Sequence, residues 1–152
     1  MNQVCDYKKK IEQTGVIAFL PSGTSMWPTL KGKGQIVVVE KKEDELKKFD
    51  VALFVRGDGK YVLHRVVKVE KDCYIVRGDS QTYLEKVNKE QVLGVMTGFY
   101  KGKKLVSCTD TAYIKRVERW YKGGFFVNLK LKNFFFWQRV GNKLKKIFKT
   151  KK

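Results

Sequence analysis

The sequence is poor in several residue types that mark particular structures and chemistries. Its 152 residues include one histidine, two prolines and three cysteines. Cys5, Cys73 and Cys108 show no CxxC spacing, so the sequence predicts neither a disulfide framework nor a zinc site, and no metal or other cofactor is expected. The sequence has no run of about 18 apolar residues, so no membrane-spanning helix is predicted.

Acidic residues are also scarce, since 15 Asp and Glu stand against 33 Lys and Arg and the formal net charge is +18. The excess is greatest in residues 111–152, which contain thirteen Lys or Arg and a single acid, Glu118. Such a block favours phosphate-bearing partners, either lipid headgroups or nucleic acid. The polar N-terminus and the short apolar run 16–20 do not resemble a signal peptide, so a cytoplasmic protein is expected.

The residues that remain are sufficient for a packed domain, because 43% of the chain is hydrophobic. Many short apolar segments with turns between them predict a mainly β domain over residues 1–110, with a coiled or barrel-like sheet. A short helix is expected at 3–14, ending at Gly15. Asp58-Gly59 predicts a hairpin turn, because glycine adopts a positive φ at little cost. The expected strands are 16–20, 35–40, 51–55, 61–69, 73–76, 92–100 and 105–107.

The pattern changes in residues 111–152, which are expected to form a partly helical tail. At about 100° per residue, segment 134–149 places aromatic and aliphatic side chains on one side and lysines on the other, which predicts a basic amphipathic helix. This helix packs on the domain, binds nucleic acid, or attaches peripherally to the anionic inner membrane face. The membrane is preferred over nucleic acid. The expected contact residues are Trp137, Arg139, Lys143 and Lys146.

Residues 22–30 read Ser-Gly-Thr-Ser-Met-Trp-Pro-Thr-Leu. A serine hydroxyl becomes a nucleophile when a neutral base takes its proton and when fixed donors meet the oxygen that becomes negative. Ser25 is the candidate nucleophile, and its amide, together with Ser22, Gly23 or Thr24, is the candidate oxyanion site. An ordinary turn has a similar composition, so the residues alone leave both interpretations open.

The single histidine, His64, lies in the strand-like run 61–69. An imidazole has an ordinary pKa of about 6.5, so it is mostly neutral and basic at physiological pH. His64 is therefore a candidate general base, and a buried core histidine is the alternative. If it is the base, activity should fall as the pH drops through about 6 to 7. The other candidate bases are Lys60 and Lys68.

Four segments resemble, in order, the sequence boxes of type I signal peptidases, whose all-β catalytic fold is shared with LexA-like self-cleaving proteins. In that family the serine immediately before methionine is the nucleophile, which is Ser25 here. Histidine followed by arginine, as at His64, resembles the endoplasmic-reticulum type and not the bacterial lysine type. The four segments lie within residues 14–100 and are 22–30, 49–54 (Phe-Asp-Val-Ala-Leu-Phe), 63–67 (Leu-His-Arg-Val-Val) and 77–81 (Arg-Gly-Asp-Ser-Gln).

The resemblance implies a serine endopeptidase that acts on a peptide or protein substrate. It also implies that Asp79 orients His64 as the third member of a triad, while an ordinary turn aspartate is the alternative. The 24 residues before Ser25 hold neither a membrane span nor a helix-turn-helix module, so secretory signal-peptide cleavage is not implied. The alternative function is a non-catalytic module of this fold that binds nucleic acid or a peptide through its basic tail. The oligomeric state is left open.

Overall fold

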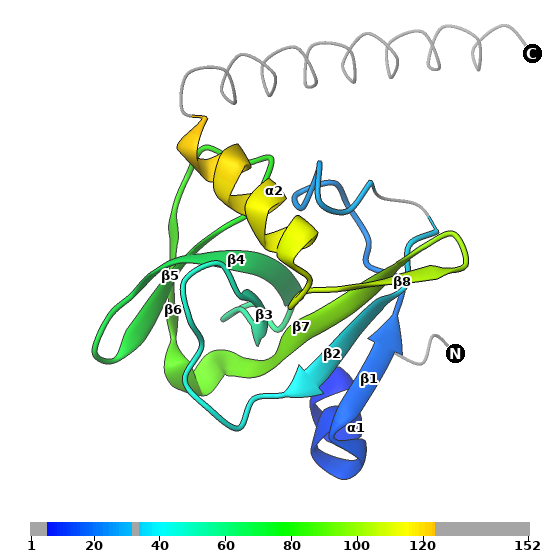
Figure 1. The fold of residues 1–152 in the computed structure, drawn as a ribbon. Helices are drawn as coiled ribbons and strands as arrows, with labels where there is room; N and C mark the ends of the chain where they lie inside the picture. Colours follow the sequence, from blue (N-terminus) through cyan, green and yellow to red (C-terminus); the bar gives the residue numbers. More distant parts are fainter. Residues whose placement is uncertain (1–5, 32–33, 124–152) are drawn as a thin grey trace, which may run out of the picture. The chain divides into compact units, whose positions relative to one another are not determined.

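A computed structural model of the chain describes residues 6–31 and 34–123. The chain divides into two compact units, residues 1–117 and 118–152. The described residues are mainly β, as the sequence predicts (Figure 1). The elements in chain order are α1 Tyr7–Thr14, β1 Val16–Phe19, β2 Val37–Lys41, β3 Val51–Val55, β4 Tyr61–Val69, β5 Cys73–Arg77, β6 Glu85–Asn88, the 3-10 helix η1 Lys89–Gln91, β7 Val92–Lys101, β8 Lys104–Ser107 and α2 Thr111–Lys122.

The eight strands form one antiparallel sheet. Its strand order is β1-β2-β7-β3-β4-β5-β6, and β8 pairs with β7 off this path. The sheet is open, and β7 joins its two halves by pairing with both β2 and β3. The register shifts at Val38/Val39, Leu53/Phe54 and Val66/Lys68. Such bulges bend a strand and increase its twist, which gives the sheet the curvature seen in Figure 1.

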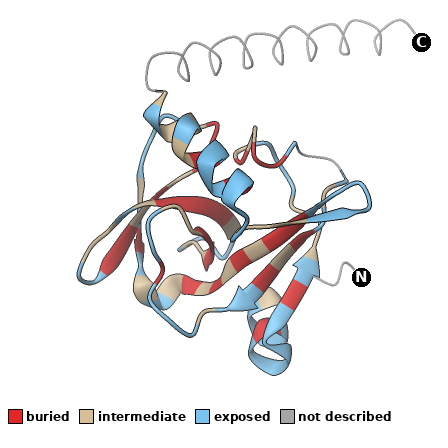
Figure 2. Cartoon of the chain, viewed as in Figure 1, coloured by how far each residue is buried: buried red, intermediate tan, exposed pale blue. Residues whose placement is uncertain are grey.

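The main core cluster is formed by strands β3 to β6, the start of β7 and the loop before β3. Phe54 and Tyr74 are its largest members, and both are fully buried. The buried hydroxyl of Tyr74 accepts a hydrogen bond from the Leu46 amide at 3.1 Å, so this polar atom is satisfied. Figure 2 shows the buried residues concentrated along these strands. The cluster comprises Leu46, Ala52, Phe54, Val66, Tyr74, Val76, Val87 and Val92.

Helix α1 packs against the sheet through Ile11, which is 1% exposed. The helix begins after Asp6, whose side chain accepts from the Lys9 amide, and it ends at Gly15 with φ +72°, as the sequence predicts. A Cβ atom on Gly94 of β7 would clash with the Glu40 carbonyl oxygen of β2 and would lie 2.7 Å from Cδ1 of Ile11. The close approach of both β2 and α1 to β7 therefore depends on the missing side chain at Gly94.

Helix α2 begins at the start of the predicted tail. The Asp110 carboxylate accepts a hydrogen bond from the Ala112 amide at 2.9 Å, which is the usual way in which an aspartate begins a helix. Tyr113 and Val117 are its buried residues. The amphipathic helix predicted at 134–149, with its expected contacts Trp137, Arg139, Lys143 and Lys146, lies outside the described residues. Neither of the two described helices is long and apolar enough to cross a membrane.

Candidate active site

Ser25 lies in a turn between β1 and β2 that is anchored by buried apolar side chains on its C-terminal side. Met26 and Leu30 are 4% and 3% exposed. Two backbone bonds close the turn, from the Trp27 amide to the Thr24 carbonyl at 3.0 Å and from the Leu30 amide to the Met26 carbonyl at 2.8 Å. Ser25 itself is half-buried. Its neighbours therefore hold its backbone while the hydroxyl stays accessible.

The loop after β5 holds the Ser25 turn from the other side. The amide and the hydroxyl of Ser80 both donate to the Ser25 carbonyl, at 2.9 and 3.0 Å. The Ser80 hydroxyl is also within 2.9 Å of the Thr24 carbonyl. A Cβ atom on Gly78 would lie 2.8 Å from the Ser25 carbonyl oxygen, so only glycine allows this approach. This support by Ser80 and Gly78 was not predicted from the sequence.

His64 lies on β4 and is 2% exposed. Its ring packs edge-on against Phe54, with 6.0 Å between ring centroids. Burial lowers the pKa of His64 to about 4, while the charges of Glu85 and Asp79 raise it and that of Arg56 lowers it. The imidazole is therefore neutral at physiological pH and able to accept a proton. The drop in activity expected at pH 6 to 7 moves down to the range near pH 4.

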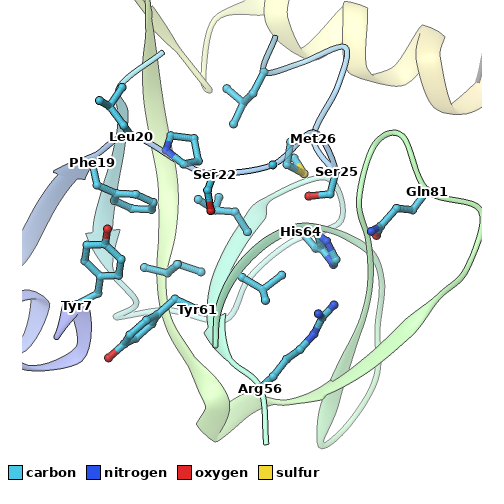
Figure 3. Close-up of a pocket in the computed structure, with 16 residues that line it drawn as sticks. Tyr7, Phe19, Leu20, Ser22, Ser25, Met26, Arg56, Tyr61, His64 and Gln81 are labelled. Carbon is cyan, nitrogen blue, oxygen red and sulfur yellow. The ribbon is translucent and has the colours of Figure 1, made fainter. Parts of the chain in front are cut away.

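Ser25 and His64 line the same cavity, which has a volume of about 290 Å³. Figure 3 shows the Ser25 hydroxyl on the side of the cavity where the His64 ring lies. No hydrogen bond joins these two side chains among those of the described residues. The cavity brings a hydroxyl and a neutral base to one accessible space, which is the minimum arrangement for base-assisted nucleophilic attack.

Two of the expected oxyanion residues, Ser22 and Gly23, also line the cavity. Gly23 has a φ of +89°, which favours glycine. Thr24 is exposed and its carbonyl faces Ser80, so it contributes to the turn. The Ser25 amide and the Ser22 hydroxyl therefore stay the candidate oxyanion donors.

The structure pairs the Asp79 carboxylate with Arg65 and Thr29, whereas the family resemblance implies a bond to His64. The carboxylate forms a two-point ion pair with Arg65, with Nε–Oδ1 and Nη2–Oδ2 distances of 2.7 Å. It also accepts a hydrogen bond from the Thr29 hydroxyl. Within the described part of the chain, the buried Nδ1 atom of His64 has no hydrogen-bond partner. Because adjacent residues of a strand point to opposite faces, Arg65 binds Asp79 on the face of β4 away from the His64 ring.

Arg65 is the centre of this buried polar cluster and is fully buried. Besides Asp79, its guanidinium donates to the Phe49 carbonyl at 2.8 Å, the Tyr113 hydroxyl at 3.0 Å and the Thr29 hydroxyl at 3.1 Å. Burial lowers the pKa of Arg65, but the Asp79 carboxylate raises it well above its ordinary value. Arg65 thereby ties β4 to the end of the Ser25 turn and to α2. Apart from the position of Arg65 next to His64, no sequence feature predicted this role.

The alternative bases lie on the surface. Lys60 pairs with Asp58 at 2.9 Å and Lys68 pairs with Glu70 at 2.8 Å, with side chains 74% and 67% exposed. Neither lysine lines the cavity around Ser25. Asp58 also accepts a hydrogen bond from the Lys60 amide at 3.1 Å, so it stabilises the hairpin turn.

An aromatic group forms the other end of the cavity. Tyr7 of α1 packs on Phe19 and Tyr61, with ring centroids 4.6 and 5.0 Å apart. The Tyr61 hydroxyl donates to Asp6 at 2.8 Å, which fixes the start of α1 beside β4. These rings are on the opposite side of the view from Ser25 and His64 in Figure 3. The cavity therefore combines a polar end with an apolar end.

Comparisons of the chain with protein-family models, with curated proteins and with solved structures find no match. Within residues 6–31 and 34–123, no group of three or more His, Cys, Asp or Glu side chains is placed to hold a metal ion. The site is thus described by its own geometry and by the motifs of the sequence.

Proposed function

We propose that the protein is a serine endopeptidase with a Ser25–His64 dyad and a signal-peptidase-like or LexA-like catalytic fold. The observation that carries this proposal is the shared cavity, which both Ser25 and a neutral His64 ring line. The order of the four motifs supports the fold assignment. The apolar and aromatic end of the cavity supports a peptide or protein as substrate, since such surfaces accommodate apolar side chains.

In the proposed reaction, His64 takes the proton of Ser25 as its oxygen attacks a peptide carbonyl carbon. The carbonyl oxygen becomes negative and is stabilised by the Ser25 amide and the Ser22 hydroxyl. The protonated His64 gives its proton to the leaving amine, and an acyl-enzyme remains. Water then attacks the acyl group with His64 as the base, and the Ser25 hydroxyl is regenerated.

The proposal is tested by covalent labelling, because this needs no knowledge of the substrate. A fluorophosphonate probe should label Ser25 in the full-length protein, and peptide mass spectrometry should locate the label. Ser25→Ala should remove the labelling, and Ser107→Ala, which removes another serine hydroxyl, should leave it intact. We expect His64→Ala to slow the labelling about 100-fold or more, as loss of a general base does.

The pH dependence of labelling tests the base independently. With a His64 pKa of about 4, the rate should stay level between pH 8 and about pH 5 and fall as the pH drops through about 4. A rate that increased only in strongly alkaline solution, together with an active His64→Ala variant, would exclude His64 and indicate a lysine base. Absence of any label on a folded protein would favour a non-catalytic binding module.

A further inference from the structure

Two segments without acidic residues, 13–39 and 92–109, lie side by side in the sheet. The Tyr100 amide donates to the Ile36 carbonyl at 2.8 Å, and Gln35 Nε2 donates to the Tyr100 carbonyl at 3.4 Å. All 15 acidic residues of the chain lie outside these two segments. The lysines of this edge therefore have no acidic residue within their own segments. This edge is therefore a local concentration of positive charge.

Three large apolar side chains are exposed along this edge. Leu105 is 50% exposed, Ile36 40% and Tyr100 36%. Tyr100 lies directly opposite Leu105 in the β7–β8 ladder, and its amide bonds to Ile36, so the three side chains occupy one face of three neighbouring strand segments. Their neighbours Val37 and Phe99 point to the interior and are buried. The exposed three form a continuous apolar strip.

Lysines surround the outer end of this strip. Lys101 and Lys104 face each other at the end of the β7–β8 ladder, and Lys103 lies in the turn beside Gly102, whose φ is +63°. All three lysines are exposed, as Figure 2 shows for the hairpin tip. A lysine carries its charge on a long flexible stem, so these ammonium groups reach around the apolar strip.

We propose that this β7–β8 surface, defined by Ile36, Tyr100 and Leu105 with Lys101, Lys103 and Lys104, binds the surface of an anionic membrane. Lipid headgroups supply the negative charge that the lysines require, and the adjacent acyl region takes up apolar side chains. Tyrosine suits this boundary because its ring is apolar and its hydroxyl is polar. A nucleic acid offers phosphate but no apolar layer for Leu105 and Ile36, so the exposed strip favours lipid.

The surface is independent of the proposed peptidase activity, because its residues do not line the cavity around Ser25. It also lies entirely within residues 1–117 and does not rest on the predicted helix at 134–149. Binding through it should be reversible, and its electrostatic part should weaken with salt because ions screen exposed charges.

The test is flotation of the full-length protein with vesicles of phosphatidylcholine containing phosphatidylglycerol at low salt. Each lysine near an anionic surface contributes about 1 kcal/mol, so replacing Lys101, Lys103 and Lys104 by Gln should weaken binding about 100-fold. The matched control replaces the exposed Lys8, Lys9 and Lys10 of α1 by Gln, which gives the same net charge. This control should retain most of the affinity.

A second pair of variants tests the apolar strip. In the proposed complex, the exposed half of the Leu105 side chain is buried in the membrane. Leu105→Ser removes this apolar contact and should weaken binding about fivefold. Leu84→Ser, which removes an equally apolar side chain that is 60% exposed elsewhere, should bind like the unchanged protein. Fluorophosphonate labelling of Ser25 should be the same in all variants, which separates this proposal from the peptidase proposal.

Three results would overturn the membrane proposal. The first is equal vesicle binding by the two lysine triple variants, and the second is equal binding by Leu105→Ser and Leu84→Ser. The third is binding of duplex DNA that depends on Lys101, Lys103 and Lys104 while vesicle binding does not, which would assign the surface to nucleic acid.

Discussion

His64 and Arg65 are adjacent residues with different surroundings and different tasks. The His64 ring lines the cavity and is neutral, whereas Arg65 is charged and neutralised by Asp79 behind the strand. A strand can provide both because its side chains alternate between faces. The same alternation directs the Arg65 side chain, which binds Asp79, to the face of β4 opposite the His64 ring.

Asp79→Asn distinguishes these two roles. Removing the charge of Asp79 leaves a buried, unpaired Arg65, so we expect the free energy of unfolding to fall by about 3 to 5 kcal/mol. The labelling rate of Ser25 in the folded variant should fall less than tenfold. Urea denaturation and fluorophosphonate labelling at a temperature well below unfolding would measure the two effects. The exposed Asp58→Asn is the control and should change neither quantity appreciably.

A stable Asp79→Asn variant whose labelling rate fell by several orders of magnitude would contradict this assignment. That result would restore the triad role implied by the family resemblance, in which a wrong imidazole tautomer abolishes activity.

At the scale of elements, strands with alternating or continuous apolar residues could be predicted from the sequence. β3 and β4 have the predicted bounds, 51–55 and 61–69, because both are rich in β-branched and apolar residues and are joined by an Asp-Gly turn. β6 was not predicted, because Glu85–Asn88 contains a single apolar residue, Val87. This strand is instead defined by its backbone pairing with β5. Pairing of this kind depends on a distant strand and leaves little local pattern.

Part of the candidate site could likewise be predicted from the sequence, and part could not. Ser25 and His64 could be predicted because each lies in a motif whose residue types carry chemistry. Arg65, Thr29 and Ser80 could not, because their roles depend on contacts between residues 14 to 55 positions apart. A sequence shows which side chains are present, and only the folded sheet shows which of them meet.

The contact between α1 and β7 yields a prediction at this scale. Gly94→Ala places a methyl group against the Glu40 carbonyl oxygen, Ile11 and Val39, and overpacking of this kind costs about 1 to 3 kcal/mol. Thermal unfolding should show this loss. Gly57→Ala is the matched control, because a Cβ atom there meets nothing within 4 Å and its φ is not positive. If both variants unfolded at the same temperature, α1 would not depend on Gly94 for its position.

For the whole molecule, burial of His64 makes stability depend on pH. The pKa of His64 is about 6.5 in the unfolded chain and about 4 in the folded one, so between these values the unfolded chain binds more protons. Stability contributed by the neutral ring is therefore fully present above pH 6.5 and is lost as the pH falls toward 4. This difference in pKa corresponds to about 3 kcal/mol.

Urea denaturation between pH 7 and pH 4.5 would measure this dependence. His64→Gln removes the titrating group, so its free energy of unfolding should vary less over this range than that of the unchanged protein. Equal slopes for the two proteins would show that His64 does not titrate differently on folding. Carboxylates with lowered pKa values, such as Asp6 and Glu70, are the same in both proteins and should affect them alike.

The position of β7 has a consequence for the newly made chain. Strands β1 and β2, which flank the Ser25 turn, are connected by hydrogen bonds to β3 and β4, which carry His64, only through β7 in the ordered sheet. During synthesis Ser25 and His64 both emerge before residues 92–101, and long-range pairings of this kind form late. Before β7 is made, the contacts of the Ser25 turn with Arg65 and Ser80 are available, but the two halves of the sheet are not yet paired. Completion of translation through β7 therefore joins the half that carries Ser25 to the half that carries His64.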